Sequence, residues 1–95
     1  MNLSKIISEQ KASILDVRTP AEFSGGHVAG SINIPLQELP QRMAELKTLK
    51  QPLVICCASG MRSSQACTFL SQFEFNCLNG GSWKDVNYAQ SLNHN

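Results

Sequence analysis

The chain has few charged residues, few aromatic residues and no long apolar run. Charged residues make up 16% of its 95 residues and aromatic residues 6%, and the formal net charge is +1. A net charge this small provides no overall field that would attract nucleic acid or an anionic membrane. The longest apolar run, residues 53–58, is much shorter than the roughly 18 residues that a membrane span requires. We therefore expect no nucleic-acid partner and no membrane partner.

The N-terminal segment also lacks a basic stretch followed by an apolar one, so no export signal is visible. Four cysteines could form a disulfide framework in a secreted protein, but without that signal we expect a reducing cytoplasm and free thiols. Metal binding fits poorly, because Cys56 and Cys57 are adjacent, Cys67 and Cys77 are isolated, and no C-x2-C pair exists. The sequence predicts a cytoplasmic protein without a structural metal.

Strand-like and helix-like segments alternate along a chain of one-domain length. The apolar runs predict four strands, over 13–17, 32–34, 53–57 and 75–78. The run 53–57 is apolar on both faces, so we expect it in the centre of the sheet. Apolar spacing and turn residues predict helices over 3–11, from 20 onward with Thr19 as cap, and over 40–49, 63–73 and 82–90. This alternation predicts one domain over residues 1–95, an α/β fold with helices on both faces of a small, mainly parallel sheet.

The segment from Cys57 to Ser63 carries the most specific chemical signal. Cys57 ends the predicted central strand, four residues separate it from Arg62, and a helix follows with Ser63 as its expected cap. Ligands of parallel sheets bind at the carboxyl ends of strands. A loop that wraps this end can direct its N–H groups inward as an anion-binding nest, and Gly60 permits the required backbone angles. With the helix start and Arg62 nearby, the sequence predicts a lowered pKa for Cys57.

The remaining loop residues are the candidate substrate-binding residues: Ala58, Ser59, Gly60, Met61, Arg62 and Ser63. The other three cysteines are expected to be inert. Cys56 must point to the opposite face of the strand from Cys57, whereas Cys67 and Cys77 have no polar loop beside them.

Two enzyme classes could use such a loop. Cysteine-dependent phosphatases place five residues between the cysteine and the arginine, and they need a general acid for the leaving alcohol. Four intervening residues make a tighter pocket, which suits a single transferred sulfur atom, and neither Asp16 nor Asp85 is a convincing acid. A phosphatase-like enzyme is the alternative that the residues leave open.

From about residue 3 to residue 88, the sequence resembles the rhodanese domain family, and particularly its small stand-alone members. Its first signature is matched by LDVRTP at 15–20, EF at 22–23 and GHVAGSINIP at 26–35. The active-site strand and loop are matched by ICCASGMRS at 55–63, and the closing signature by LNGGSW at 78–83. Two positions depart from the family: Cys56 replaces a frequent aromatic residue and Gln72 a usual glycine.

The resemblance implies a rhodanese-like three-layer α/β/α fold and a thiosulfate sulfurtransferase that needs no cofactor. Cys57 would take sulfur from thiosulfate or a related anionic donor as a persulfide, and pass it to cyanide, a thiol or a protein cysteine. Arg62 would steer the donor. We expect a monomer or a weak homodimer.

Three other matched residues are expected to support the site. Asp16 and Arg18 would hold the loops, with a direct substrate contact by Arg18 left open. His27 would order its own loop through a hydrogen bond, because a preformed thiolate needs no general base. A non-catalytic rhodanese-like binding module is the second alternative, although such modules usually lack the cysteine that is present here.

Overall fold

A computed structural model describes residues 2–92 and contains a four-stranded parallel sheet with the order β2-β1-β3-β4. The strands are β1 (Ser13–Asp16), β2 (Ile32–Asn33), β3 (Leu53–Cys57) and β4 (Cys77–Ser82). Strand β3 lies between β1 and β4 and is buried along its whole length. The predicted α/β fold with a parallel sheet is confirmed, and so is the central position of residues 53–57.

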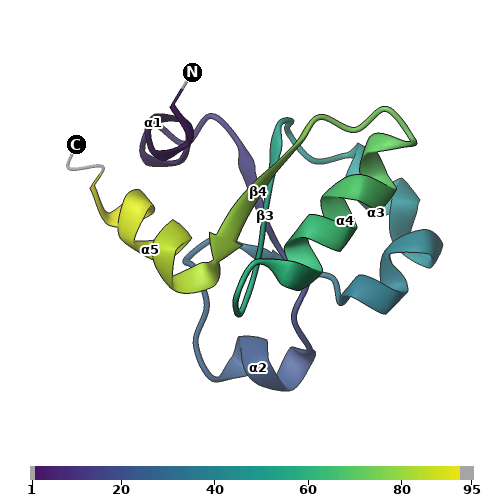
Figure 1. Ribbon diagram of the computed structural model, residues 1–95, viewed down its shortest axis with the longest axis horizontal. Helices are drawn as coiled ribbons and strands as arrows, with labels where there is room; N and C mark the ends of the chain where they lie inside the picture. The colour runs from purple at the N-terminus through teal and green to yellow at the C-terminus, as the bar shows by residue number, and fades with distance from the viewer. Residues whose placement is uncertain (1, 93–95) are drawn as a thin grey trace.

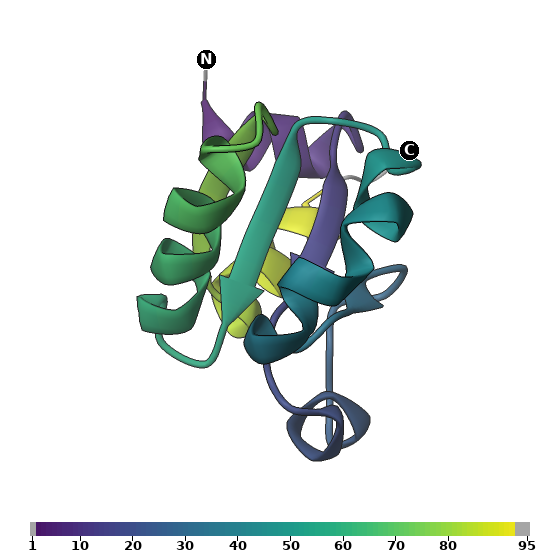
Figure 2. The same cartoon turned by 90° about the vertical axis from the view of Figure 1, so that its right-hand side faces the viewer.

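Helices cover both faces of the sheet (Figures 1 and 2). Helices α1 (Leu3–Ser8) and α5 (Trp83–Ser91) pack on one face; the 3-10 helix η1 (Leu36–Arg42), α3 (Met43–Lys47) and α4 (Met61–Ser71) pack on the other. Because side chains alternate along a strand, β3 contributes Val54 and Cys56 to the core under α1 and α5, and Ile55 and Cys57 to the core under α3 and α4.

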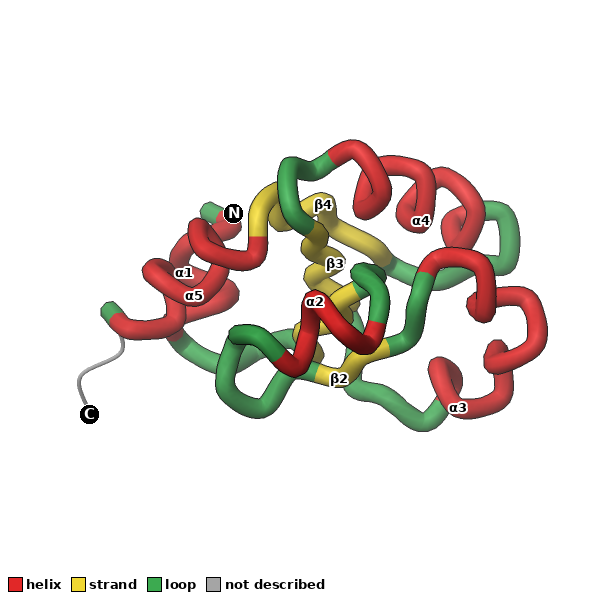
Figure 3. Tube along the Cα trace, turned by 90° about the horizontal axis from the view of Figure 1, so that it is seen from below, coloured by secondary structure: helices red, strands yellow, loops and turns green. Residues whose placement is uncertain are grey.

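The short helix α2 (Pro20–Ser24) lies beyond the carboxyl ends of the strands (Figures 1 and 2). Seen from below, it lies in front of the sheet, between the helices on the two sides (Figure 3). Its start is the one predicted. Thr19 is the N-cap and Pro20 the first helical residue. The Thr19 hydroxyl accepts a bond from the backbone N–H of Glu22, and the Glu22 carboxylate accepts one from the backbone N–H of Thr19. This capping box fixes Glu22 at the end of the sheet where parallel α/β proteins bind ligands.

Several predicted element boundaries are wrong. The first helix ends at Ser8, because the chain turns through Gln10 at a φ of 56°. The expected helix over 40–49 is a 3-10 helix followed by the short helix α3; Pro40 lies inside the 3-10 helix and has no N–H for an α-helical bond. Strand β4 begins at Cys77, two residues later than the predicted strand over 75–78, and continues beyond its predicted end through the glycines at 80 and 81.

Strand β4 stays paired with β3 through the two glycines because it contains one extra residue, which shifts the register of the pairing. Ile55 is paired with Asn79 and Cys56 with Gly81, so Gly80 is an extra residue in β4. A Cβ at Gly80 would lie 2.8 Å from Val86 and 2.9 Å from Val54, so only glycine fits there without displacement. Within residues 2–92, no helix is long and apolar enough to cross a bilayer.

Candidate active site

The loop after β3 wraps around the sulfur of Cys57. The backbone N–H of Gly60 donates to Cys57 Sγ at 2.9 Å, and the backbone N–H of Ser63 points to the same atom at 3.4 Å. Gly60 has a φ of 104° and is itself the N-cap of α4, so the prediction that Ser63 caps this helix is wrong. The sequence-predicted wrap of N–H groups is present, and it depends on a backbone conformation that favours glycine.

The remaining loop residues form the outer surface of the wrap. Ala58, Ser59 and Met61 are exposed, Met61 to 72% of its full surface. Cys57, by contrast, has no exposed surface. The loop therefore surrounds the sulfur and separates it from solvent.

Two opposing effects act on the pKa of Cys57. Burial raises the pKa of the thiol, but hydrogen bonds lower it: they come from the backbone N–H and hydroxyl of Ser63, and from the backbone N–H groups of Gly60 and Ser59. The hydrogen bonds together outweigh the effect of burial, so the pKa of Cys57 lies below its ordinary value. The lowered pKa that the sequence predicted comes from N–H and O–H donors around the sulfur.

The loop is tied to β4 by Asn79, a residue to which sequence reasoning gave no role. The buried Ser63 hydroxyl lies 3.6 Å from Cys57 Sγ and donates to Asn79 Oδ1 at 2.6 Å. Asn79 Oδ1 also accepts from the backbone N–H of Gly81, and Asn79 Nδ2 donates to the Gly60 carbonyl at 3.3 Å. The sequence feature that could have indicated this role is a polar residue near the carboxyl end of the strand beside the loop.

Arg62, which we expected to steer an anionic donor, forms a two-bond ion pair with Glu22. Arg62 Nη1 and Nη2 lie 2.8 and 3.0 Å from the two carboxylate oxygens of Glu22. The hydrogen bond from Arg62, together with that from Thr19, lowers the pKa of Glu22 to about 2. Both side chains of the pair are about one-third exposed, at 34% and 36%.

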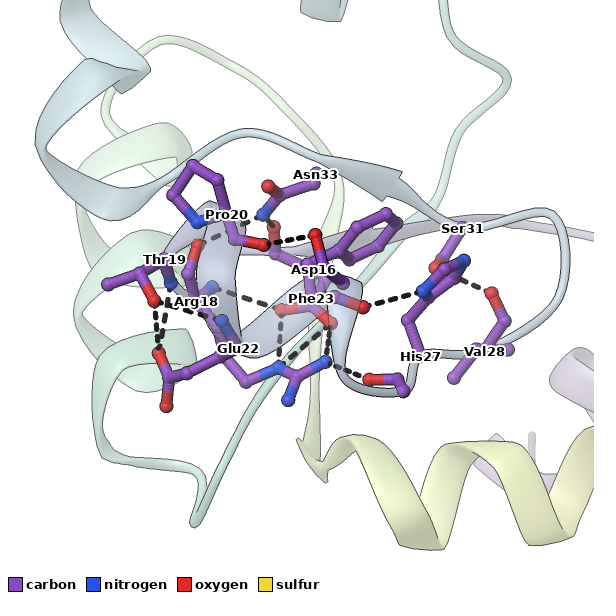
Figure 4. Close-up of polar contacts among 12 residues, drawn as sticks. Asp16, Arg18, Thr19, Pro20, Glu22, Phe23, His27, Val28, Ser31 and Asn33 are labelled. Atoms are coloured by element: carbon purple, nitrogen blue, oxygen red, sulfur yellow. Dashed lines mark hydrogen bonds and ion pairs between the residues drawn. The ribbon is translucent and has the colours of Figure 1, made fainter.

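Asp16 and Arg18 form a buried ion pair at the end of β1 (Figure 4). Arg18 Nη2 lies 2.8 Å from Asp16 Oδ2 and donates to the Gly26 carbonyl at 2.7 Å, while Nε donates to both Asp16 oxygens. The guanidinium also lies over the Trp83 ring, 4.9 Å from its centre. These contacts join β1, the loop after α2 and the start of α5, and so support the loop-holding role of the pair.

His27 contacts its own loop (Figure 4). Its Nδ1 lies 2.7 Å from the Phe23 carbonyl oxygen, and its ring stacks on the Phe23 ring at 3.7 Å between centres. This geometry fits the expected loop-ordering role.

The other cysteines differ from Cys57. Burial, aided by Asp16, raises the pKa of Cys56 to about 12 on the opposite face of β3. Cys67 and Cys77, which are isolated in sequence, are brought together: their mutual hydrogen bond lowers the pKa of Cys67 and raises that of Cys77. All four cysteines are free thiols. Within residues 2–92, no cluster of three or more His, Cys, Asp or Glu side chains could hold a metal ion.

A family model described as a rhodanese-like domain matches residues 2–87, nearly the whole chain and all of the site described above. The chain belongs to this rhodanese-like family. A thiosulfate sulfurtransferase of Escherichia coli is 38% identical to it over 76% of this chain and 71% of its own length. A thiosulfate sulfurtransferase of Stutzerimonas stutzeri is 32% identical over 87% of this chain and 79% of its own length.

Other relatives differ in how much of their own length this chain covers and in what their names say. An uncharacterized protein of Bacillus subtilis is 47% identical over 60% of this chain, which spans only 44% of that relative's length. A sulfurtransferase of Allochromatium vinosum is 35% identical over 72% of this chain and 63% of its own length. Among solved structures, a rhodanese-related protein of Thermoplasma volcanium has a TM-score of 0.74 at 34% identity, covering 85% of this chain and 80% of its own.

Proposed function

We propose that this rhodanese-like domain is a sulfurtransferase that carries sulfur as a persulfide on Cys57. The observation that carries the proposal is the pair of backbone N–H groups, of Gly60 and Ser63, directed at Cys57 Sγ. Donors held in this way stabilise a thiolate before the reaction and an anionic outer sulfur after it. The names of the Escherichia coli and Stutzerimonas relatives support the same chemistry.

The reaction divides into two transfers. In the first, the Cys57 thiolate attacks the outer sulfur of thiosulfate; a Cys57 Sγ–S bond forms, the S–S bond of the donor breaks, and sulfite leaves with the electron pair. In the second, an acceptor thiolate attacks the outer sulfur of the persulfide and releases the Cys57 thiolate. Covalent catalysis replaces one difficult transfer by two easier ones and needs no metal.

The closed loop places a condition on both transfers. Because Cys57 has no exposed surface, residues 58–62 must move outward before a donor or acceptor reaches the sulfur. Such a short loop gives room for one added sulfur atom more readily than for a phosphoryl group with its oxygens. This favours sulfur transfer over the phosphatase alternative.

Brief treatment with thiosulfate, followed by its removal, tests the proposal. We expect the intact mass to rise by one sulfur, about 32 Da, and peptide mapping to place the sulfur on Cys57. Sulfur on Cys67 or Cys77 instead would contradict the assignment. Hydrolysis of an aryl phosphate that is lost in Cys57→Ser would favour the phosphatase, and a Cys57 unreactive toward both thiosulfate and iodoacetamide would favour the binding module.

A further inference from the structure

The charge that should attract an anionic donor is cancelled at the loop itself. Arg62 is the only basic residue between Cys57 and Ser63. Both of its terminal nitrogens are engaged by the two oxygens of Glu22, at 2.8 and 3.0 Å. The loop therefore presents a neutral ion pair, not a free cation, beside the cysteine.

The pairing of Glu22 with Arg62 is preorganised and persists over the physiological pH range. Thr19 donates its backbone N–H to Glu22 Oε1 at 2.9 Å, and its hydroxyl also contacts this oxygen at 3.1 Å. The carboxylate thus joins the start of α2 to the start of α4. With its pKa lowered to about 2, Glu22 keeps its negative charge wherever the protein would work. A change of pH between 5 and 9 does not release Arg62.

We propose that Glu22 is a specificity-determining residue that disfavours dianionic donors such as thiosulfate and favours donors of lower charge, namely organic persulfides. The inference rests on the proposed sulfurtransferase function. The carboxylate acts through Arg62 and through its own field, because each negative charge on a donor is repelled by Glu22 and meets an Arg62 whose charge is already compensated. The N–H groups of Gly60 and Ser63 are directed at Cys57 Sγ and stabilise its thiolate whatever the charge of the donor.

Sulfur transfer from an organic persulfide needs no further reactant. The Cys57 thiolate attacks the outer sulfur of R–S–SH, the Cys57 Sγ–S bond forms, and the S–S bond of the donor breaks. The thiolate R–S⁻ leaves with the electron pair, and the proton stays on the transferred sulfur. This donor carries no charge, or one charge when ionised, whereas thiosulfate carries two.

Glu22→Gln removes the charge while keeping an oxygen for the capping box, because glutamine is accepted at this position of the motif. The chain offers a matched control in Arg42 and Glu45, an exposed pair with two bonds of 2.7 and 3.0 Å that includes no loop residue. Glu45→Gln alters net charge by the same amount and removes a comparable two-bond contact without changing the loop, while Arg42 keeps its 3.0 Å bond to Glu38.

The first measurement compares the alkylation of Cys57 by iodoacetate, an anion, with that by iodoacetamide, which is neutral, using peptide mapping to follow this cysteine alone. Both reagents attack the same thiolate, so the ratio of their rates cancels any change in the pKa of Cys57 or in loop opening. We expect the ratio of iodoacetate to iodoacetamide to rise about 3- to 10-fold in Glu22→Gln and to stay unchanged in Glu45→Gln. An unchanged or lower ratio in Glu22→Gln, or an equal rise in both variants, overturns the inference.

The second measurement is donor kinetics. In Glu22→Gln we expect kcat/KM for thiosulfate to rise about 10-fold or more, mainly through KM, and kcat/KM for cysteine persulfide to change about 3-fold or less. Equal changes for the two donors would overturn the assignment of donor choice to Glu22. Failure of the wild type to take sulfur from either donor would instead overturn the proposed function, and the alkylation ratio would still report the charge effect of Glu22.

Discussion

Cys56 and Cys57 are neighbours in β3, yet the two faces of this strand give them opposite chemistry. Both side chains are fully buried. The pKa of Cys56 is raised to about 12, mainly by burial, whereas the pKa of Cys57 is lowered because hydrogen bonds outweigh burial. Burial alone therefore does not decide the reactivity of a cysteine at the end of a strand.

The two faces also differ in what supplies positive potential. Cys56 has the guanidinium of Arg18 in range, which favours its thiolate, but Asp16 lies there as well and opposes it. Cys57 has N–H groups from Gly60 and Ser63 pointed at its sulfur. Donors with fixed direction and no attached counter-charge stabilise a buried thiolate more effectively than an arginine that is already paired.

Two ion pairs of different kinds lie at the carboxyl ends of the strands. Asp16 and Arg18 are 0% and 5% exposed and share several hydrogen bonds, so they belong to the packed interior. Glu22 and Arg62 are about one-third exposed and join two helix starts. The first pair should therefore matter to stability and the second to the charge that a substrate meets.

The matched substitutions Cys57→Ser and Cys56→Ser test the difference between the two faces of β3, and they should give the largest effect. We expect Cys57→Ser to reduce sulfur transfer from thiosulfate to cyanide by at least about 1,000-fold, because the nucleophile is lost. Cys56→Ser should leave turnover within about 3-fold, because its side chain faces the other core, and should lower the free energy of unfolding by about 1–3 kcal/mol through a buried hydroxyl. Steady-state kinetics and urea unfolding measure the two effects, and comparable losses of turnover would refute the separation of the faces.

The arginines provide the next comparison. Arg18→Ala should lower the free energy of unfolding by about 3–5 kcal/mol, because it leaves the buried Asp16 carboxylate without its partner. Arg62→Ala should cost about 1 kcal/mol or less, since its pair is partly exposed and screened by solvent. Urea denaturation of both variants at neutral pH checks the order; an Arg62→Ala loss as large as that of Arg18→Ala would show that the Glu22 pair is structural.

Much of this arrangement was accessible from sequence, because local rules determine it. The apolar run 53–57, the cap at Thr19 and the glycine at 60 each act through neighbouring residues or backbone angles, and all three predictions agree with the structure. Alternation along a strand was enough to separate Cys56 from Cys57.

The contacts that sequence reasoning missed join residues far apart in the chain. Glu22 was recognised only as part of a signature, and its pairing with Arg62 spans 40 positions. Asn79 reaches back 16 positions to Ser63. Neither spacing follows from helical or strand periodicity, because both depend on how α2 and β4 pack at the end of the sheet. The requirement for glycine at position 80 was missed for the same reason, since it comes from the closeness of Val54 and Val86.

Ser63→Ala and Ser59→Ala sharpen the comparison within the loop, with the smallest expected effect. Ser63 places its hydroxyl 3.6 Å from Cys57 Sγ, whereas Ser59 is exposed and contributes through its backbone N–H. In the thiol form Cys57 Sγ donates to Ser63 Oγ, and the hydroxyl proton of Ser63 goes to Asn79. When the thiol ionises, this hydroxyl can turn and donate to the sulfur, so removing it should raise the pKa of Cys57. We expect iodoacetamide to alkylate Cys57 about 2- to 10-fold more slowly at pH 7 in Ser63→Ala, and at nearly the wild-type rate in Ser59→Ala.

The pH dependence separates this effect from simple loosening of the loop. At alkaline pH the thiol is ionised in every variant, so the Ser63→Ala and wild-type rates should converge as the pH rises through the pKa of the variant. A difference that persists unchanged at alkaline pH would mean that the substitution alters access to Cys57. In that case the hydroxyl would act by bracing the loop against Asn79, with which it shares a 2.6 Å hydrogen bond, and the backbone N–H groups alone would lower the pKa of Cys57.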